Sequence, residues 1–357
     1  MPRDMTRRVR TRAQHGRRAA RAAGLRHVGD DVPGILRVGE PGAFQYVSAR
    51  GRPLRDPSTL RRIARLAIPP AYAKVWICTD PRGHLQATGR DARGRKQYRY
   101  HPDWRATRDV HKFDRLLAFG EALPSIRRRV RRDLATSGLH RDKVLALIVA
   151  LLDATRLRIG NSVYERDNRS YGLTTLRVRH ADFSGGRLRL SFRGKGGAEH
   201  DHVVDDRRLA RIVRRCHDLP GQRLFQFLEA DGTRRAVDSG MVNDYLRQVT
   251  GRDFTAKDFR TWGATLSACA RLACLPLPER RSERALKACI NGVIRDVAAE
   301  LRNTPAVCRK SYIDPCVFDG WRDGRLQRSF TSSTRMTSRG VERRALRFLR
   351  AEARRAT

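Results

Sequence analysis

Lysine is scarce in this chain, and its few lysines mark positions where a proton could be transferred. Only eight of the 76 basic residues are lysines, namely Lys74, Lys96, Lys112, Lys143, Lys195, Lys257, Lys287 and Lys310. An ammonium group can release its proton when its pKa is lowered, whereas a guanidinium group stays charged and presents a planar fork that matches phosphate oxygens. The pattern therefore favours arginine contacts to phosphate, with lysine available for proton transfer.

The net charge of +39 indicates a polyanionic partner, most often duplex DNA or RNA. Charge confined to the chain ends would say little about a folded body. Residues 1–26 carry +8 and residues 335–357 carry +6, so the body between them retains +25. The folded part itself is strongly basic, and we expect it to bind duplex DNA.

Five segments combine residues that suit phosphate chemistry. They are Leu157–Asn161, Ser170–Leu176, Phe192–Gly197, Thr255–Trp262 and Asn303–Pro315. Each segment alone is a weak signal, but their joint order and spacing resemble the type IB DNA topoisomerases of the short bacterial and poxvirus kind. The resemblance spans roughly residues 55–320.

This resemblance implies a role for one residue in each of four segments. Tyr312 corresponds to the nucleophile, Arg158 and Arg260 to the catalytic arginines, and Lys195 to the general acid. Poxvirus and nuclear enzymes carry a histidine nine residues before the tyrosine, where this chain has Asn303, as bacterial members do. An asparagine can donate a hydrogen bond to a phosphate oxygen but cannot supply a proton.

The implied reaction agrees with the chemistry of these residue types. Attack by Tyr312 would leave a 3′-phosphotyrosyl link and a free 5′-hydroxyl, so that the cut strand can rotate and supercoils of either sign relax before resealing. Arginine forks suit the negative charge that builds on the nonbridging oxygens, and Lys195 can protonate the leaving oxygen. Because the covalent link preserves the bond energy, we expect no cofactor, neither ATP nor a metal. The sequence has no phosphate-binding GxxxxGK[ST] loop.

Further positions are interpreted as DNA contacts, with plainer alternatives beside them. In the catalytic region these are Tyr164, Lys257, Arg309 and Lys310, and in the N-terminal region they are Gln86, Tyr98 and Tyr100. The alternative for the N-terminal set is an ordinary exposed face of a sheet. Asn303 also has an alternative role at a helix start, since Thr304 suits the cap and Pro305 the first helical position.

The elements that would position these residues change in type along the chain. Before residue 103 we expect strands at 42–48, 75–78, 83–88 and 97–101 and one helix at 57–66. Helical periodicity then predicts helices at 112–121, 124–136, 141–158, 205–216, 238–249, 257–273, 281–301, 305–313 and 340–354. Gly160 is the expected cap of the third of these. Strands around 187–193 and 200–204 form a hairpin with Lys195 at its tip.

The predicted fold is α+β, and the resemblance implies a clamp around the duplex. It comprises a basic tail (1–27), a small β-rich domain (28–105), a mainly helical, tyrosine-recombinase-like catalytic domain containing the hairpin (106–334), and a basic C-terminal helix or tail (335–357). Seven cysteines without a CxxC pair argue against disulfides and zinc, and most have apolar neighbours typical of core positions. With no apolar run of 18 residues, we expect no membrane partner and a cytoplasmic, nucleoid-associated monomer.

Two other functions remain in competition at this stage. A tyrosine recombinase uses the same chemistry, but usually carries His-x-x-Arg where this chain has Lys257–Arg260. A DNA-compacting protein without enzymatic activity would explain the charge but not the spaced segments.

Overall fold

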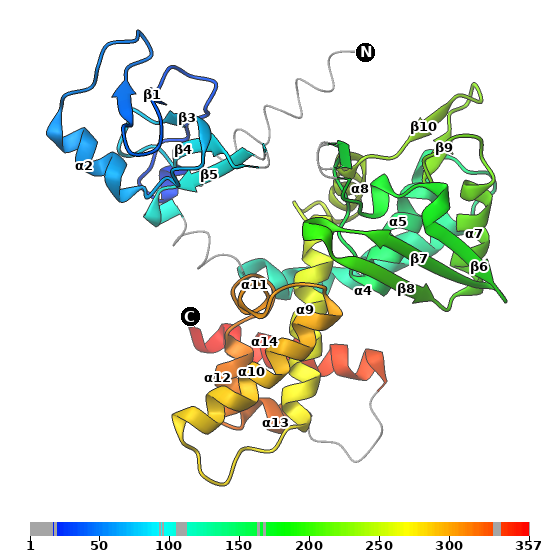
Figure 1. Cartoon of the computed structure of the whole chain (residues 1–357). Helices are drawn as coiled ribbons and strands as arrows, with labels where there is room; N and C mark the ends of the chain where they lie inside the picture. The colour runs from blue at the N-terminus through cyan, green and yellow to red at the C-terminus, as the bar shows by residue number, and fades with distance from the viewer. Residues whose placement is uncertain are drawn as a thin grey trace. The chain divides into compact units, whose positions relative to one another are not determined.

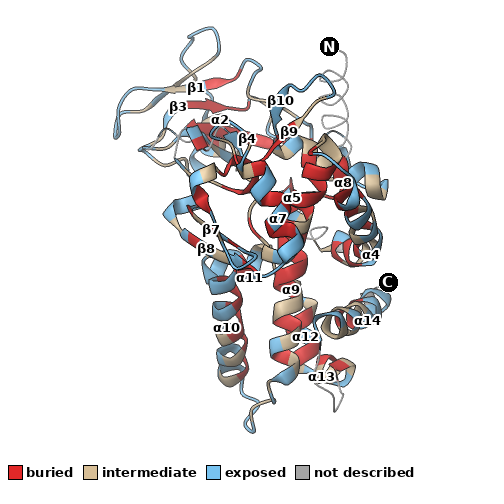
Figure 2. Ribbon diagram, turned by 90° about the vertical axis from the view of Figure 1, so that its right-hand side faces the viewer, coloured by how far each residue is buried: buried red, intermediate tan, exposed pale blue. Residues whose placement is uncertain are grey.

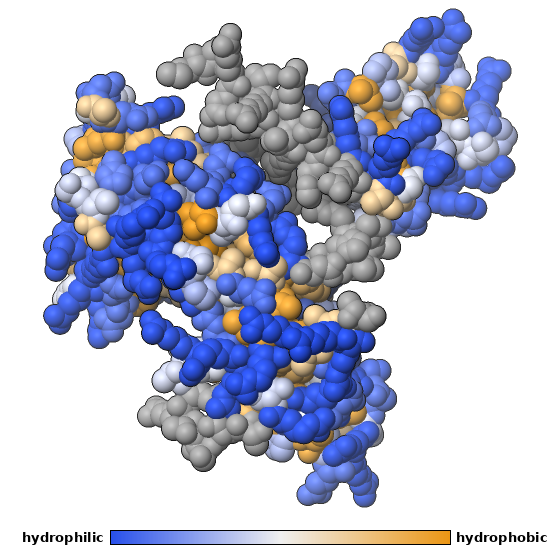
Figure 3. Space-filling view, turned by 180° about the vertical axis from the view of Figure 1, so that it is seen from behind, coloured by the Kyte–Doolittle hydropathy of each residue, from blue (hydrophilic) through white to orange (hydrophobic). Residues whose placement is uncertain are grey.

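The computed structural model describes residues 17, 20–92, 94, 96–104, 113–162, 165–166, 169–330 and 337–356. The chain divides into two compact units, Met1–Phe113 and Asp114–Thr357 (Figure 1). Hydrophilic side chains cover most of the face of each unit that is visible in Figure 3. None of the helices in the described ranges is long and apolar enough to cross a membrane.

The N-terminal unit is built on one antiparallel sheet with the strand order β2-β1-β3-β4-β5. Its strands are β1 (Ile35–Val38), β2 (Gln45–Val47), β3 (Ala73–Ile77), β4 (Leu85–Arg90) and β5 (Lys96–Tyr100). The predicted strands correspond to β2, β3, β4 and β5, while β1 was not predicted. The β-rich character of this unit is therefore confirmed.

Both faces of this sheet are covered by apolar side chains. On one face Val75 and Ile77 pack with Ile63, which lies on helix α2 (Pro57–Arg65). Successive side chains of a strand point to opposite faces, so Trp76 lies on the other face, in a cluster with Leu85. Helix α2 begins at Asp56, whose carboxylate accepts hydrogen bonds from two backbone N–H groups of the first turn.

Part of the expected N-terminal tail belongs to this folded unit. Ala20 and Leu25 are buried against Trp104, and Arg26 forms a β-bridge with Gly83. The prediction of a tail through residue 27 is thus wrong for residues 20–27, because the two apolar side chains cover a hydrophobic cluster. Most of residues 1–19 lie outside the described residues.

The C-terminal unit is mainly helical, as predicted. Its helices are α4 (Asp114–Ala135), α5 (Arg141–Thr155), α7 (Arg207–His217), α8 (Ser239–Thr250), α9 (Ala256–Cys274), α10 (Glu283–Glu300), α11 (Pro305–Ser311), α12 (Cys316–Arg322), α13 (Arg325–Phe330) and α14 (Ser338–Ala356). Helix α9 runs through the middle of this unit and contacts α4, α5, α8, α10, α12, α13 and α14. Helix α5 and the first half of α9 are strongly buried (Figure 2).

The predicted hairpin is present within a three-stranded antiparallel sheet of order β6-β7-β8. Strand β7 (Arg187–Arg193) pairs with β8 (Glu199–Val204), and the short 3-10 helix η3 (Lys195–Gly197) forms the tip. Leu188, Leu190 and Phe192 alternate into the core. Strand β6 (Ala181–Ser184) and the pair β9 (Gln226–Leu228) and β10 (Arg234–Ala236) were not predicted.

Two predicted helix boundaries are wrong. Helix α4 is continuous across Pro124, although a proline inside a helix costs about 3 kcal/mol. Phe119, Leu123 and Ile126 are almost fully buried on both sides of the proline, and this burial holds the two halves as one helix. Helix α5 ends at Thr155 instead of residue 158, because Arg156 adopts a left-handed conformation with φ 56°. Arg156, not Gly160, is therefore its cap.

The C-terminal segment is more than a tail. Helix α14 buries Ala345, Phe348 and Leu349, and it packs against α4, α9 and α13. The short helices α12 and α13 before it were not predicted. The expectation for the cysteines holds for Cys78, Cys216, Cys269 and Cys308, which are buried, whereas Cys274 is exposed.

Candidate active site

Four segments distant in sequence meet around Tyr312. Arg158 follows the end of α5, Arg260 lies on α9, Asn303 follows α10, and Tyr312 ends α11. The guanidinium of Arg158 donates a hydrogen bond through Nη2 to Oδ1 of Asn303. The guanidinium carbon of Arg260 lies 5.2 Å from the centroid of the Tyr312 ring. The structure thus brings together four of the five residues proposed for catalysis.

Arg260 is held rigidly at the base of this pocket. Its side chain is 3% exposed, and it donates hydrogen bonds to the carbonyl oxygens of Arg156 and Leu301, the latter at 2.9 Å. Both acceptors lie at helix ends, after α5 and α10, where carbonyl oxygens lack partners within the helix. The arginine therefore ties together two segments that also carry Arg158 and Asn303.

Three nitrogen atoms of this pocket are buried without a hydrogen-bond partner among the described residues. They are Nη1 of Arg158, Nε of Arg260 and Nδ2 of Asn303. Leaving a buried donor unpaired costs about 1–3 kcal/mol, and more for charged groups. Most buried polar groups in proteins are paired, so three unpaired donors in one pocket indicate that it is built to receive acceptor atoms. Two charged donors and one neutral donor suit an anion.

The surroundings of Tyr312 favour its ionised form. Burial by itself raises the pKa of the phenol, but the positive charges of Arg260, Arg158 and Lys257 outweigh burial and bring the pKa below its ordinary value of 10. Burial also lowers the pKa of the two guanidinium groups, and Arg260 is lowered further by the charge of Arg158. A guanidinium nevertheless stays protonated in proteins, so the charge of the pocket is fixed.

Helix α9 positions its side chains through its N-terminus. Thr255 and Asp258 form a reciprocal capping box, in which the Asp258 carboxylate accepts from the Thr255 backbone N–H at 2.7 Å. Lys257 and Arg260 follow three residues apart, on neighbouring positions of the same helix face. Two turns further, the fully buried Thr265 donates to the carbonyl oxygen of Tyr312 at 3.2 Å.

The segment Ser170–Leu176 links the Arg158 segment to the hairpin. The backbone N–H of Leu173 donates to the carbonyl of Arg158 at 2.9 Å, and that of Thr174 donates to Ile159 at 2.7 Å. On the other side, the N–H of Tyr171 donates to the carbonyl of Arg193 at 2.9 Å, at the end of β7. The motif noticed in the sequence is therefore a brace between two parts of the site.

A network of charged side chains holds the segment that follows α5 and leads to Arg158. Arg156 forms an ion pair with Glu300 at 3.4 Å, and Glu300 also pairs with Arg271 at 2.6 Å. The Arg156 side chain crosses Gly263, where an added Cβ would lie 2.4 Å from its Cδ and Nε atoms. Only glycine leaves room for this crossing.

Lys195 belongs to the hairpin and not to the segments around Tyr312. It is exposed at the tip of the hairpin, in η3, and the strongest charges acting on Tyr312 come from Arg260, Arg158 and Lys257. The glycines around it, Gly196 and Gly197, have φ values of 77° and 83°, which other residues rarely adopt.

Comparison with known proteins decides the family. A model of the eukaryotic DNA topoisomerase I catalytic core matches residues 101–316, and one of the bacterial DNA topoisomerase IB N-terminal domain matches residues 43–91. The DNA topoisomerase 1B of Acanthamoeba polyphaga mimivirus is 33% identical over 291 residues, covering 79% of this chain and 85% of the relative. This chain belongs to the type IB DNA topoisomerases. The vaccinia virus (strain Copenhagen) DNA topoisomerase 1B is 22% identical over 258 residues, covering 71% and 76% of the two chains.

The two roles considered for Asn303 are separated in this topoisomerase. Thr304 caps α11, since its hydroxyl accepts from the N–H of Val307 at 3.3 Å, and Pro305 is the first helical residue. The side chain of Asn303 instead faces Arg158. The helix start therefore depends on its neighbours, and Asn303 is free to act in the pocket.

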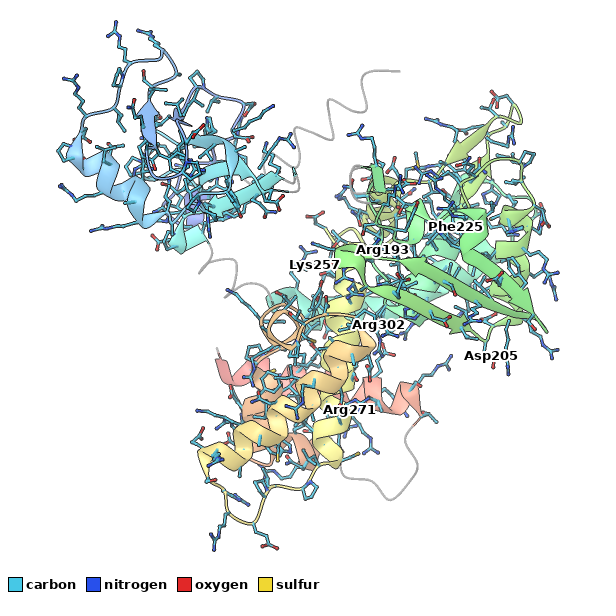
Figure 4. The ribbon with its side chains drawn as sticks, in the orientation of Figure 1. Arg193, Asp205, Phe225, Lys257, Arg271 and Arg302 are labelled. Carbon is cyan, nitrogen blue, oxygen red and sulfur yellow. The ribbon has the colours of Figure 1, made fainter. Side chains whose placement is uncertain are left out.

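The other residues expected to contact DNA in the catalytic unit lie near the site. Lys257 and Lys310 are exposed, on the first turn of α9 and the last turn of α11. Arg309 is exposed too, but it donates to Asn291 at 2.9 Å and covers the ring of Phe318. Figure 4 labels Lys257 at the start of α9 and Arg193 at the end of β7. Tyr164 lies outside the described residues.

The N-terminal residues expected to contact DNA fare differently. Gln86 is only 2% exposed: its Nε2 donates to the carbonyl of Gly83 at 2.7 Å, and its Oε1 accepts from Arg62 at 2.7 Å. The expectation that Gln86 reaches a DNA groove is contradicted, because its amide is committed to the fold. Tyr98 is 46% exposed and stacks on Tyr100 with ring centroids 6.0 Å apart. Tyr100 is partly buried against two hydrophobic clusters, so Tyr98 is the more accessible of the two rings.

Several residues of the site escaped the sequence analysis. Thr265, Glu300 and Gly263 act through contacts with segments far along the chain, and their own positions on helices gave no signal. His200 also escaped: it is 4% exposed, stacks on Phe192 at 4.9 Å, and has a pKa of about 4, through burial first and then the charges of His202 and the nearby arginines. The alternation of β8 could have placed His200 inside.

Proposed function

We propose that this type IB DNA topoisomerase cleaves one strand of duplex DNA by attack of Tyr312 on a backbone phosphorus. The phenolic oxygen would form a 3′-phosphotyrosyl bond while the bond to the 5′ oxygen breaks. Rotation of the cut strand would relax supercoils of either sign, and the 5′-hydroxyl would then attack the phosphotyrosine and release Tyr312. The depressed pKa of the phenol supports this role, since its ionised form is the nucleophile.

The observation that carries the assignment is the set of unpaired donors beside Tyr312. A pentacoordinate phosphorus carries added negative charge on its nonbridging oxygens, and donors that are already oriented stabilise that charge without reorganisation. Nη1 of Arg158, Nε of Arg260 and Nδ2 of Asn303 are such donors. In this proposal Asn303 stabilises charge and orients Arg158, but transfers no proton.

Lys195 is proposed as the general acid that protonates the leaving 5′ oxygen. The charges of Arg260 and Arg302 act on His200 and His202 of the same hairpin, which supports this role. The hydrogen bond from Tyr171 to Arg193 fixes the base of the hairpin that carries Lys195. The Tyr98–Tyr100 surface, Lys257, Arg309, Lys310 and Tyr164 are proposed to contact the duplex.

The retained bond energy of the phosphotyrosine leaves no step that requires ATP, and the fixed arginine charges supply the stabilisation for which other enzymes use a metal. We therefore propose an activity without cofactors. We also propose that the protein acts as a monomer on duplex DNA in the cytoplasm, associated with the nucleoid.

A plasmid relaxation assay without ATP and with a metal chelator tests this function. We expect the wild-type protein to relax negatively and positively supercoiled plasmid, and denaturation during the reaction to trap protein covalently on the 3′ end of a nicked strand. Tyr312→Phe should lose both activities while retaining duplex affinity. Tyr46→Phe, a phenol removal in the N-terminal sheet, is the matched control and should keep them.

Each competing function gives a different result in the same assay. A tyrosine recombinase would exchange strands between defined sites and leave a plasmid without such sites unrelaxed. A charge-dependent DNA-compacting protein would release free DNA on denaturation. Undiminished relaxation by Tyr312→Phe would refute the assignment of the nucleophile.

A further inference from the structure

Arg302 occupies a backbone conformation that an arginine seldom adopts. It has φ 48°, in the left-handed region. Its N–H donates to the carbonyl of Ala299 at 3.1 Å, and the next N–H, of Asn303, donates to Ala298 at 2.9 Å. These two bonds form the usual glycine-containing terminus of a helix, here the end of α10, and Arg302 stands at the position where glycine is strongly preferred. Placing a side chain there costs energy, so that a functional reason is worth seeking.

The guanidinium of Arg302 is not committed to the fold. Arg302 is exposed, and no described residue accepts a hydrogen bond from its side chain or forms an ion pair with it. The nearest carboxylate in sequence, Glu300, is already paired with Arg156 and Arg271. Nothing within the described part of the chain therefore repays the strain at this position.

Arg302 adjoins the catalytic pocket in the chain, and its charge reaches the Lys195 hairpin. It precedes Asn303 directly, and its charge is the largest charge acting on His202, which burial already holds at a lowered pKa; it also acts on His200. Both histidines lie on β8, the return strand of the Lys195 hairpin. Figure 4 labels Arg302 where α10 gives way to α11, beside that hairpin. A positive charge at this position directly precedes Asn303, one of the donors that would hold the reacting phosphate.

We propose that Arg302 binds a DNA backbone phosphate flanking the one that Tyr312 attacks, and that the left-handed strain is retained for this contact. The inference rests on the proposed function, which places a phosphate in the neighbouring pocket. A guanidinium on a fixed helix terminus would set the register of the strand without contacting a base.

Replacing Arg302 by glycine separates strain from binding. Arg302→Gly relieves the left-handed conformation, and we expect the melting temperature to rise by roughly 2–4 °C. Noncovalent binding should weaken, and the slope of log affinity against log salt should become shallower by about 0.9, the value of one phosphate contact. The proteins with Arg302 and with Arg302→Gly are both measured in the Tyr312→Phe background, so that no covalent complex contributes to the affinity.

An uncharged replacement for a single backbone phosphate shows which phosphate Arg302 contacts. We expect a series of duplexes, each with one methylphosphonate at a different position beside the cleavage site, to include one that the Arg302-containing protein binds more weakly than unmodified duplex. The affinity of the Arg302→Gly variant should be unchanged by the methylphosphonate at that position. Arg302→Lys should preserve the salt slope and the melting temperature. Ala67→Gly, which relieves a left-handed residue (φ 47°) in the N-terminal unit, should raise stability and leave the slope unchanged.

Two results would overturn the inference. One is an unchanged salt slope with no coupled methylphosphonate position, and the other is a lower melting temperature for Arg302→Gly, which would make the side chain structural. Failure of the proposed function would be seen in a different experiment, the trapping assay, in which wild-type protein would form no covalent complex.

Discussion

A single methyl group added at Gly172 should push the Arg158 segment away from the segment that links it to the Lys195 hairpin. Gly172 lies in the brace between Arg158 and the hairpin, with an extended backbone (φ −153°) that alanine can adopt. A Cβ at this position would lie 2.5 Å from the nitrogen of Gly160, and 2.7 Å from both the carbonyl oxygen of Arg158 and the Cα of Gly160. All three are backbone atoms, so no side-chain rotation can relieve the clash.

The size of the effect of Gly172→Ala follows from these distances. Ordinary contact begins near 3.4 Å, so the segment 158–160 and the brace must separate by about 0.7–0.9 Å. Overpacking of this kind typically costs about 1–3 kcal/mol of stability. A misplacement approaching 1 Å in a catalytic group can reduce a rate by roughly 10²-fold, and Arg158 lies at the displaced position.

The assay separates the two effects. Single-turnover cleavage of a short duplex reports the chemical step, duplex affinity reports binding, and denaturant unfolding reports stability. We expect Gly172→Ala to lose about 10²-fold in cleavage with affinity little changed. The control Gly292→Ala lies on α10, where the nearest atom to the added Cβ is 3.9 Å away, and it should gain up to about 1 kcal/mol. A cleavage rate for Gly172→Ala within twofold of wild type would refute the reasoning.

Two further predictions concern titration. Lys257→Ala should raise the pKa of Tyr312, because it removes one of the positive charges that lower this pKa. The pKa is measured from tyrosinate absorbance, with the Tyr312→Phe protein as the blank, and Lys257→Arg should leave it unchanged. An unchanged pKa in Lys257→Ala would count against the proposed environment of Tyr312. His200 has a folded pKa of about 4, below its ordinary 6.5, so its contribution to stability is present above pH 6.5 and lost as the pH falls through about 4. The free energy of unfolding, measured with denaturant, should therefore fall by roughly 2 kcal/mol less in His200→Gln than in wild type between pH 7 and pH 4.5. An equal fall in the two proteins would contradict the low pKa assigned to His200.

The sequence by itself determined the family, the positions of most helices and the hairpin that carries Lys195. Helical periodicity and strand alternation are local properties, fixed by 3.6 and 2 residues per repeat, so they can be recognised without knowledge of the fold. The segments containing Arg158, Arg260 and Tyr312 were recognised differently, because their joint order and spacing resemble those of the type IB DNA topoisomerases.

Only the tertiary structure decided how these segments combine. Asn303 contacts Arg158 across 145 residues of chain, and the amide of Gln86 is held inside the N-terminal unit by carbonyl groups and Arg62. Helix α5 ends early because Arg156 turns left-handed to reach Glu300 and offer its carbonyl to Arg260. Such outcomes depend on which distant donors and acceptors packing brings within about 3 Å, and no local pattern specifies that.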